Sequence, residues 1–126
     1  MIGDSYTGND FYCDVAIPQE GDLDVVHSSK DVLAFHHTKP HWQTHLVVVP
    51  KRHIGSMTTA THADAITVRA LLVTVQAIAR EVEEREGAAA VQTNLGAYQD
   101  SKHLHIHVYA GPLTTPPLAQ HRRRRT

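Results

Sequence analysis

Cysteine is nearly absent from the chain, and this absence limits both its chemistry and its compartment. Cys13 is the only cysteine among 126 residues. A single thiol cannot close a disulfide within the chain, and no second cysteine completes a C-x-x-C metal or redox pair. We therefore interpret Cys13 as a small, buried packing residue. A reducing interior is the natural compartment for such a chain.

Long apolar runs and an excess of one charge sign are absent as well. No run approaches the ~18 apolar residues of a membrane span, and the opening MIGDSYTGNDFYCD is acidic and polar where a signal peptide is basic and then apolar. The 12 Lys and Arg residues nearly balance the 13 Asp and Glu residues, so we expect no basic surface suited to nucleic acid or an anionic membrane. These absences predict a cytoplasmic protein whose main partner is neither a membrane nor a nucleic acid.

The size of the chain predicts one domain followed by a tail. With 126 residues, of which 41% are apolar, the chain suits a single globular domain with a substantial core. We expect this domain over residues 1–112. Residues 113–126, LTTPPLAQHRRRRT, combine adjacent prolines with a run of arginines, which is typical of an irregular basic tail. We interpret the arginine run as a solvated end rather than a binding site.

One long helix is expected over residues 61–86. Thr61 with Asp64 is a signal for a helix start, and Gly87 suits a left-handed helix end. Apolar residues recur at helical spacing and predict one buried face, made of Val68, Leu71, Leu72, Val75, Ile78, Ala79 and Val82.

Strands are expected on both sides of this helix. Runs of β-branched, aromatic or alternating apolar residues predict strands at 31–37, 45–50, 90–95 and 103–109. The strands do not alternate regularly with helices, so the pattern predicts an antiparallel α+β domain.

The last predicted strand contains an alternating row of histidines. In KHLHIHVYAG, His103, His105 and His107 would share one face of a strand, about 7 Å apart per step, while Leu104, Ile106 and Val108 face the core. We therefore expect the histidines to face a cleft. The row alone fits three interpretations: a metal site, a chance arrangement in a chain with 11 histidines, or catalysis.

The surrounding sequence resembles the histidine triad family of nucleotidyl hydrolases and transferases. HLHIHVY fits the pattern His-φ-His-φ-His-φ-φ, where φ is apolar, and the upstream stretch VLAFHHTKPHWQTHLVVVPKRHI is similar to the strand, substrate loop and Thr-His strand of that family. FYCDVAIP resembles its usual opening. The resemblance covers most of the chain, from Phe11 to about Gly111, and is closest to the Hint-like branch of nucleoside phosphoramidases and nucleotidyl hydrolases.

The resemblance implies a fold and a reaction. The fold would be an antiparallel half-barrel meander of strands with one long helix and a short one, paired as a homodimer. The reaction would be hydrolysis of a nucleoside 5′-monophosphate ester or phosphoramidate through a covalent nucleotidyl-histidine intermediate, with no cofactor required. Dinucleoside polyphosphate hydrolysis is the alternative within the family. The uridylyltransferase branch usually has Gln as the last member of the triad, and His107 argues against it.

The resemblance also assigns residues. His105 matches the nucleophile, and His45, His107 and His103 would hold its ring and the phosphate oxygens. Gln99 matches a residue that contacts the scissile bridge. The expected nucleotide-binding residues are Leu23, Phe35, His36, His37, Thr38, Asn94, Tyr98, Asp100 and Ser101. The remaining histidines, among them His27, His41, His53, His62 and His121, are interpreted as surface or packing residues.

Three of these positions depart from the adenosine-binding branch of the family. His37 stands where that branch usually has an Asp that binds the ribose hydroxyls, and an imidazole cannot accept both of those hydrogen bonds. Tyr98 and Asp100 flank Gln99 where a glycine-rich turn and a serine are usual, and Asp100 would repel a phosphate. Ser101 could supply the missing hydroxyl from one residue further along.

Three classes of function therefore remain open at this stage. An enzyme would turn over nucleotides in the presence of a chelator and lose activity in a His105→Ala variant. A non-catalytic nucleotide-binding or dimeric interaction module would bind nucleotide without releasing product. A metal-binding protein would hold stoichiometric zinc and lose stability with a chelator.

Overall fold

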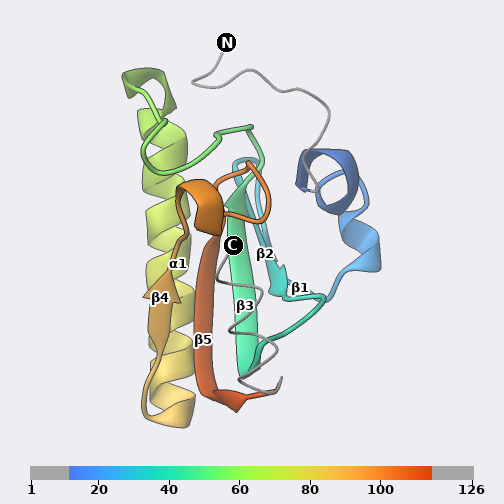
Figure 1. Ribbon diagram of the computed structural model, residues 1–126, viewed down its shortest axis with the longest axis vertical. Helices are drawn as coiled ribbons and strands as arrows, with labels where there is room; N and C mark the ends of the chain where they lie inside the picture. Colours follow the sequence, from blue (N-terminus) through green and yellow to red (C-terminus); the bar gives the residue numbers. More distant parts are fainter. Residues whose placement is uncertain (1–11, 115–126) are drawn as a thin grey trace.

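The fold is a five-stranded antiparallel sheet with one long helix packed against it (Figure 1). A computed structural model describes residues 12–114 of the chain. The strands are β1 (Val25–Ser28), β2 (Val32–His36), β3 (Trp42–Pro50), β4 (Ala90–Gln92) and β5 (Ile106–Leu113), and they lie in the order β1-β2-β3-β5-β4. The helix, α1, spans Ala65–Glu86. The predicted antiparallel α+β class is confirmed.

The two central strands β2 and β3 are buried on both faces. Alternate residues such as Val32, Ala34 and Val48 belong to the apolar cluster that contains α1. Their neighbours, such as Leu33 and Phe35, pack in a second cluster on the opposite face. Because side chains of a strand alternate between faces, two covered faces produce the continuous apolar runs VLAF and LVVV rather than a polar–apolar alternation.

The second cluster is closed by the N-terminal part of the described chain. A single π-helical turn, η1 (Tyr12–Ala16), contributes Tyr12 and Ala16 to it. This turn is the short helix of the fold, and Figure 1 shows it across the sheet from α1. Its contribution places the ring of Tyr12 beside His103 and His105, just before β5.

The ends of the long helix follow from the residues predicted to set them. Thr61 and Asp64 form a capping box around the 3-10 turn η3 (His62–Asp64) that precedes α1. Asp64 is fully buried, and its second carboxylate oxygen lies 3.0 Å from Nε of Arg52. Gly87 ends the helix with a φ of 85°, a left-handed conformation that glycine adopts without a Cβ clash. The predicted end of the helix at Glu86 is confirmed, whereas α1 begins at Ala65 rather than at Thr61 because residues 62–64 form the 3-10 turn.

The buried face of α1 is narrower than its apolar residues suggest. Leu71, Val75, Ile78 and Val82 are buried, and Val68 and Ala79 pack partly against them. Leu72 is wrongly predicted, because 51% of its side chain is exposed. Successive residues of a helix point about 100° apart, which places Leu72 outside the face that Leu71, Val75, Ile78 and Val82 share.

The strand boundaries differ from the prediction in several places: β3 begins at Trp42 rather than at residue 45, β4 ends at Gln92 rather than at residue 95, and β5 extends to Leu113 rather than to residue 109. The short strand β1 was not predicted, since only four residues form it and they alternate between half-buried and exposed. Strand β5 begins at Ile106 rather than at residue 103, so His103 and His105 precede it. The amide of Leu104 instead donates to the carbonyl of Ile54 at 2.6 Å, which fixes this segment against the chain that follows β3.

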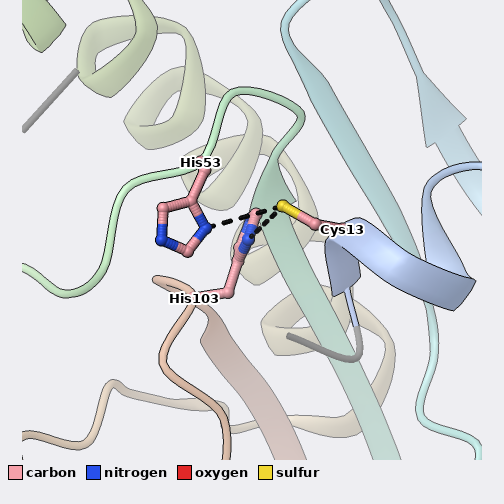
Figure 2. A group of neighbouring side chains, drawn as sticks. All are labelled: Cys13, His53 and His103. Atoms are coloured by element: carbon pink, nitrogen blue, oxygen red, sulfur yellow. Dashed lines mark hydrogen bonds between the residues drawn. The ribbon is translucent and has the colours of Figure 1, made fainter. Parts of the chain in front are cut away.

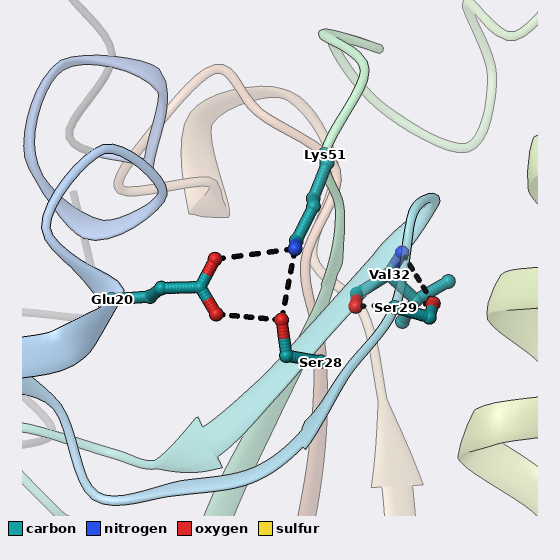
Figure 3. A network of polar contacts seen from close by, with 5 residues as sticks. All are labelled: Glu20, Ser28, Ser29, Val32 and Lys51. Atoms are coloured by element: carbon teal, nitrogen blue, oxygen red, sulfur yellow. Dashed lines mark hydrogen bonds and ion pairs between the residues drawn. The ribbon is translucent and has the colours of Figure 1, made fainter.

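A polar network fastens the edge of the sheet (Figure 3). Lys51, just after β3, lies 3.2 Å from Glu20 and donates to Ser28 Oγ of β1 at 2.9 Å. Ser28 in turn donates to Glu20 at 2.6 Å. The hydrogen bonds that Ser28 and Lys51 make to Glu20, together with the charge of Lys51, lower the pKa of Glu20 against the opposing effect of burial. These contacts connect the turn η2 (Glu20–Asp22) to β1 and to the end of β3.

The predicted boundary between domain and tail falls close to the end of β5. The strand extends to Leu113, and Thr114 donates to the carbonyls of Pro40 and His41. The remaining tail, including the arginine run, lies outside the described residues. Within residues 12–114, no helix combines the length and apolar character needed to cross a bilayer.

Candidate active site

A cavity of about 240 Å³ opens on the face of the sheet opposite α1. Its apolar lining comes from the second cluster, while its polar lining comes from the loop after β2, the segment before β5, and His107 of β5. The lining residues are Tyr12, Phe35, His37, Thr38, Lys39, Val47, Asp100, Ser101, His105 and His107. Two of the three histidines of the predicted row therefore face a cleft, as expected.

His105 is held in one tautomer. Its Nδ1 lies 2.6 Å from the carbonyl oxygen of His103, and since a carbonyl only accepts, Nδ1 must carry the proton. In the neutral ring the lone pair is then on Nε2. The ring is 4% exposed and lies 5.1 Å from the ring of Tyr12, centre to centre. The arrangement presents a nucleophilic nitrogen in a fixed orientation.

His107 is oriented by a second series of hydrogen bonds. The backbone amide of His41 donates to Nδ1 of His45 at 3.0 Å, so the proton of neutral His45 is on Nε2. That Nε2 lies 2.9 Å from Nδ1 of His107 and donates to it. Neutral His107 consequently carries its proton on Nε2, where it serves as a hydrogen-bond donor. His105 and His107 thus offer opposite functions, a lone pair and a donor.

His37 is a neutral neighbour of these rings. Its ring stacks on His45 with 4.4 Å between centres and a 22° interplanar angle. Burial lowers the pKa of His37 from 6.5 to about 4, with further lowering by the charges of His41 and His105 that outweighs the opposite effect of Asp100. Its Nδ1 accepts a hydrogen bond from the amide of Lys39 at 3.0 Å, so Nε2 carries the proton.

His103 has a different place from the other two members of the row. Its side chain is fully buried and is not part of the cavity lining. Its Nε2 donates to the carbonyl of Pro50 at 2.8 Å. The backbone carbonyl of His103, rather than its ring, contributes to the cavity by accepting a hydrogen bond from Nδ1 of His105. In contrast, Leu104, Ile106 and Val108 are buried beneath α1, as predicted.

Several other residues assigned from the sequence also lie away from the lining. The amide nitrogen of Gln99 donates to the carbonyl of Gly55 at 2.6 Å, and the side chain is buried. Asn94 accepts from Gln92 at 2.9 Å, and 58% of Tyr98 is exposed. Leu23 packs against the second apolar cluster, and His36 is exposed at the end of β2. The structure brings together Phe35, His37, Thr38, Asp100 and Ser101 with His105 and His107.

Comparisons with known proteins agree with this geometry. The family model described as "Scavenger mRNA decapping enzyme C-term binding" matches residues 9–122. An uncharacterised HIT-like protein of Synechococcus elongatus is 34% identical over 103 residues, which are 80% of this chain and 90% of that protein. The chain belongs to the histidine triad family.

Two further members of the histidine triad family are similar to this chain. Adenosine 5′-monophosphoramidase HINT3 of Xenopus tropicalis is 27% identical over 111 residues, which are 84% of this chain and 70% of that protein. The crystal structure of a HIT family hydrolase from Legionella pneumophila aligns with a TM-score of 0.71 and 27% identity, covering 86% of this chain and 98% of that one. The sheet and long helix described above are therefore the fold of histidine triad hydrolases.

Three lining residues of this histidine triad protein were missed in the sequence. Tyr12, Lys39 and Val47 line the cavity, but no local pattern marks them as site residues. Val47 reads as one apolar residue in a strand, and Lys39 as one polar residue in a loop. The only signal for Tyr12 was its position in FYCDVAIP, the stretch that resembles the family opening. Their roles depend on contacts between distant parts of the chain.

One group of side chains outside the cavity has the composition of a metal site (Figure 2). Cys13 Sγ lies 3.4 Å from Nδ1 of His103 and 3.5 Å from Nδ1 of His53. The hydrogen bond to Pro50 fixes the proton of His103 on Nε2 and leaves the Nδ1 lone pair toward the sulfur, the arrangement that orients a metal-binding imidazole. A thiolate and two imidazoles suit zinc. In the sequence, Cys13 and His53 are interpreted as packing or surface residues. The structure instead places both in a polar cluster with His103.

A second group, His37, His45 and His107, has three ring nitrogens within 4.8 Å of one another. Its hydrogen bonds oppose metal binding. Nδ1 of His45 accepts from the amide of His41, so a metal at Nε2 would require the loss of that bond or of the remaining ring proton. We interpret this group as a donor–acceptor chain that orients His107.

Proposed function

We propose that the protein is a nucleotide-binding histidine triad hydrolase that cleaves a nucleoside 5′-monophosphate ester or phosphoramidate through a nucleotidyl intermediate on His105. The observation that carries the proposal is the hydrogen bond from Nδ1 of His105 to the carbonyl of His103, which directs the Nε2 lone pair to a cavity. The phosphoramidate is preferred as the bond cleaved because one relative is named an adenosine 5′-monophosphoramidase.

The first step would transfer the nucleotidyl group to the enzyme. The Nε2 lone pair of His105 forms a bond to the α-phosphorus as the bond from phosphorus to the leaving group breaks. The leaving group departs with that electron pair and takes up one proton from solvent. The Nε2 proton of His107 donates to a phosphoryl oxygen as negative charge develops there, which stabilises the transition state.

The second step would return the enzyme to its starting state. A water oxygen forms a bond to phosphorus, the bond between phosphorus and Nε2 of His105 breaks, and the water loses one proton to solvent. The products are the nucleoside monophosphate and the free imidazole. These two displacements predict ping-pong kinetics. Because the ring nitrogen is the nucleophile of the first step and the leaving group of the second, we propose that no cofactor is required.

The inner wall of the cavity is suited to the nucleoside. Tyr12, Phe35 and Val47 provide buried apolar surface next to His105, and aromatic rings accept a base by packing against its face. Thr38 and Ser101 add hydroxyl groups to the lining. We also propose a homodimer in a cytoplasmic setting, with the nucleotide as substrate and no membrane or nucleic-acid partner.

The experiment is to look for the covalent intermediate. Wild-type protein, His105→Ala and His105→Asn would be mixed with a labelled nucleoside phosphoramidate, quenched in base and weighed intact, since acid would hydrolyse the P–N bond to the ring. We expect the added mass of the nucleotidyl group in wild type only, while nucleotide binding remains in both variants. His62→Ala, an exposed histidine on η3, is the matched control and should behave as wild type.

Variants of His45 and His107 test how much each of these residues contributes to the rate. His45→Ala or His107→Ala should lower kcat/KM by about 10²–10⁴-fold, because each removes a donor or its orienting partner. An adduct in His105→Ala would contradict the proposal. Nucleotide binding without turnover would indicate the non-catalytic module, and loss of stability with a chelator would indicate the metal-binding alternative. Faster cleavage of dinucleoside polyphosphates than of phosphoramidates would place the protein in the other hydrolase branch.

A further inference from the structure

The rim of the cavity carries two opposite charges on separate loops. Lys39 lies between β2 and β3, and Asp100 lies between the turn η4 (Gly96–Tyr98) and β5. Both side chains are exposed and both line the cavity. Among the residues that line this cavity, they are the only lysine and the only carboxylate, and the lining includes no arginine. A charged substrate therefore meets both when it enters.

Asp100 acts on the same space as the imidazoles. Its negative charge favours protonation of His37, although burial and the neighbouring imidazoles outweigh it and leave that pKa at about 4. His37 is consequently neutral at pH 7 and does not neutralise the carboxylate. A phosphate next to His105 and His107 would thus lie in the field of Asp100, which within the cavity lining is opposed only by the charge of Lys39 on the other loop.

The direction of the displacement places the leaving group at this rim. Phosphoryl transfer is close to in line, so the leaving group lies on the side of phosphorus opposite the attacking nitrogen. That nitrogen belongs to His105, which is buried on the inner side of the cavity. The nucleoside has the apolar wall of Phe35 and Val47, and the group that must reach solvent departs past the exposed side chains.

We propose that Asp100 selects the leaving group by its charge, accepting groups that carry an ammonium and disfavouring groups that add negative charge, such as a second phosphate. This inference rests on the proposed nucleotidyl transfer and specifies its substrate. Two unit charges about 6 Å apart, at an effective dielectric constant near 40, change an affinity by about tenfold. The charge of Asp100 thus contributes a preference of this size for amine-bearing substrates over polyphosphates, against the opposite effect of Lys39.

The test compares three substrates that share one nucleoside 5′-monophosphate. One has ethylenediamine attached through a P–N bond and keeps a free ammonium, one has propylamine, and the third is the nucleoside diphosphate. For each protein, the kcat/KM of one substrate is divided by that of another. Dividing this ratio in a variant by the same ratio in wild type cancels the intrinsic reactivity of the bonds, because it is the same in both proteins. Asp100→Asn and Asp100→Lys are the variants, and Asp22→Asn, an exposed acid on η2 that is not among the cavity-lining residues, is the matched control.

We expect Asp100→Asn to lower the ethylenediamine-to-propylamine ratio about tenfold and to raise the relative rate with the diphosphate. Asp100→Lys should reverse the preference, and added salt should reduce the ratio in wild type but not in Asp100→Asn. Unchanged ratios in both variants would overturn the role of Asp100 while leaving the nucleotidyl transfer intact. Absence of turnover in wild type, or turnover that persists in His105→Ala, would overturn the proposed function and this inference with it.

Discussion

At the scale of single residues, the chemistry of the site depends on which nitrogen of each histidine carries the proton. For His105 and His45, a hydrogen bond to a backbone group determines which ring nitrogen is protonated. A carbonyl fixes the proton of His105 on Nδ1, and an amide fixes the proton of His45 on Nε2. His107 then receives its tautomer from His45. A nucleophile and a hydrogen-bond donor therefore lie side by side, each oriented by the hydrogen bond at its Nδ1.

The pKa of His37 leads to a prediction about stability. Its folded pKa of about 4 lies below its ordinary value of 6.5, so between these two pH values the unfolded chain binds a proton that the folded chain does not. The free energy of unfolding should therefore fall as pH is lowered from about 6.5 to about 4. His37→Gln should remove about 2 kcal/mol of this dependence, less than the full shift implies because the ring is partly exposed.

Urea denaturation of wild type and His37→Gln from pH 4 to pH 8 measures this dependence. At pH 8 the imidazole is neutral in both states, so the difference there reports lost packing, and only the pH-dependent part tests the prediction. The other charged groups around the ring, His41, His105 and Asp100, are retained in both proteins. Parallel curves for the two proteins would show that His37 does not titrate in this way.

At the scale of elements, α1 provides a matched pair of leucines. Leu71 is 1% exposed in the cluster beneath the helix, and its neighbour Leu72 is 51% exposed. Leu71→Ala should lower the free energy of unfolding by about 2–5 kcal/mol, because it removes buried methyl groups and leaves a cavity. Leu72→Ala should change it by less than about 1 kcal/mol. Equal losses in urea denaturation would mean that the helix packs on a different face.

Local patterns were sufficient for most of these elements. The spacing of apolar residues predicted the helix, and Thr61, Asp64 and Gly87 predicted its ends. Period-two alternation predicted that Leu104, Ile106 and Val108 face the core. It did not predict β1, because four partly exposed residues give too short a pattern, or the outward position of Leu72, since spacing alone leaves the edges of a helix face undefined.

The candidate site was less predictable, because long-range contacts define it. The sequence pattern and the family resemblance indicated His105, His107 and His45, which the structure brings together. The ring of His103 points away from the cavity because its nitrogens contact Pro50 and Cys13, which are 53 and 90 residues away along the chain. Gln99 is likewise directed by Gly55, 44 residues away. No spacing rule encodes such partners, so these placements required the fold.

At the scale of the whole molecule, the two edges of the sheet differ in what they leave exposed. Strand β4 forms one edge, and its central residue Val91 is 53% exposed. Strand β1 forms the other edge, where Val26 is 46% exposed. The polar network of Glu20, Ser28 and Lys51 lies over β1 (Figure 3). Helix α1 carries the further exposed apolar residues Ile66, Leu72 and Val73.

This difference makes the β4 edge the expected contact of the proposed homodimer. An unpaired strand edge with apolar neighbours is covered most simply by a second copy related by a twofold axis. Light scattering at micromolar concentration should therefore give about twice the chain mass of 14.0 kDa. Val91→Lys should shift the mass toward the monomer, because pairing would bring two like charges together at the axis. Val26→Lys is the control with the same change at the opposite edge, and it should remain dimeric. A monomeric mass for wild type would contradict the homodimer, and a monomer produced only by Val26→Lys would place the interface at β1.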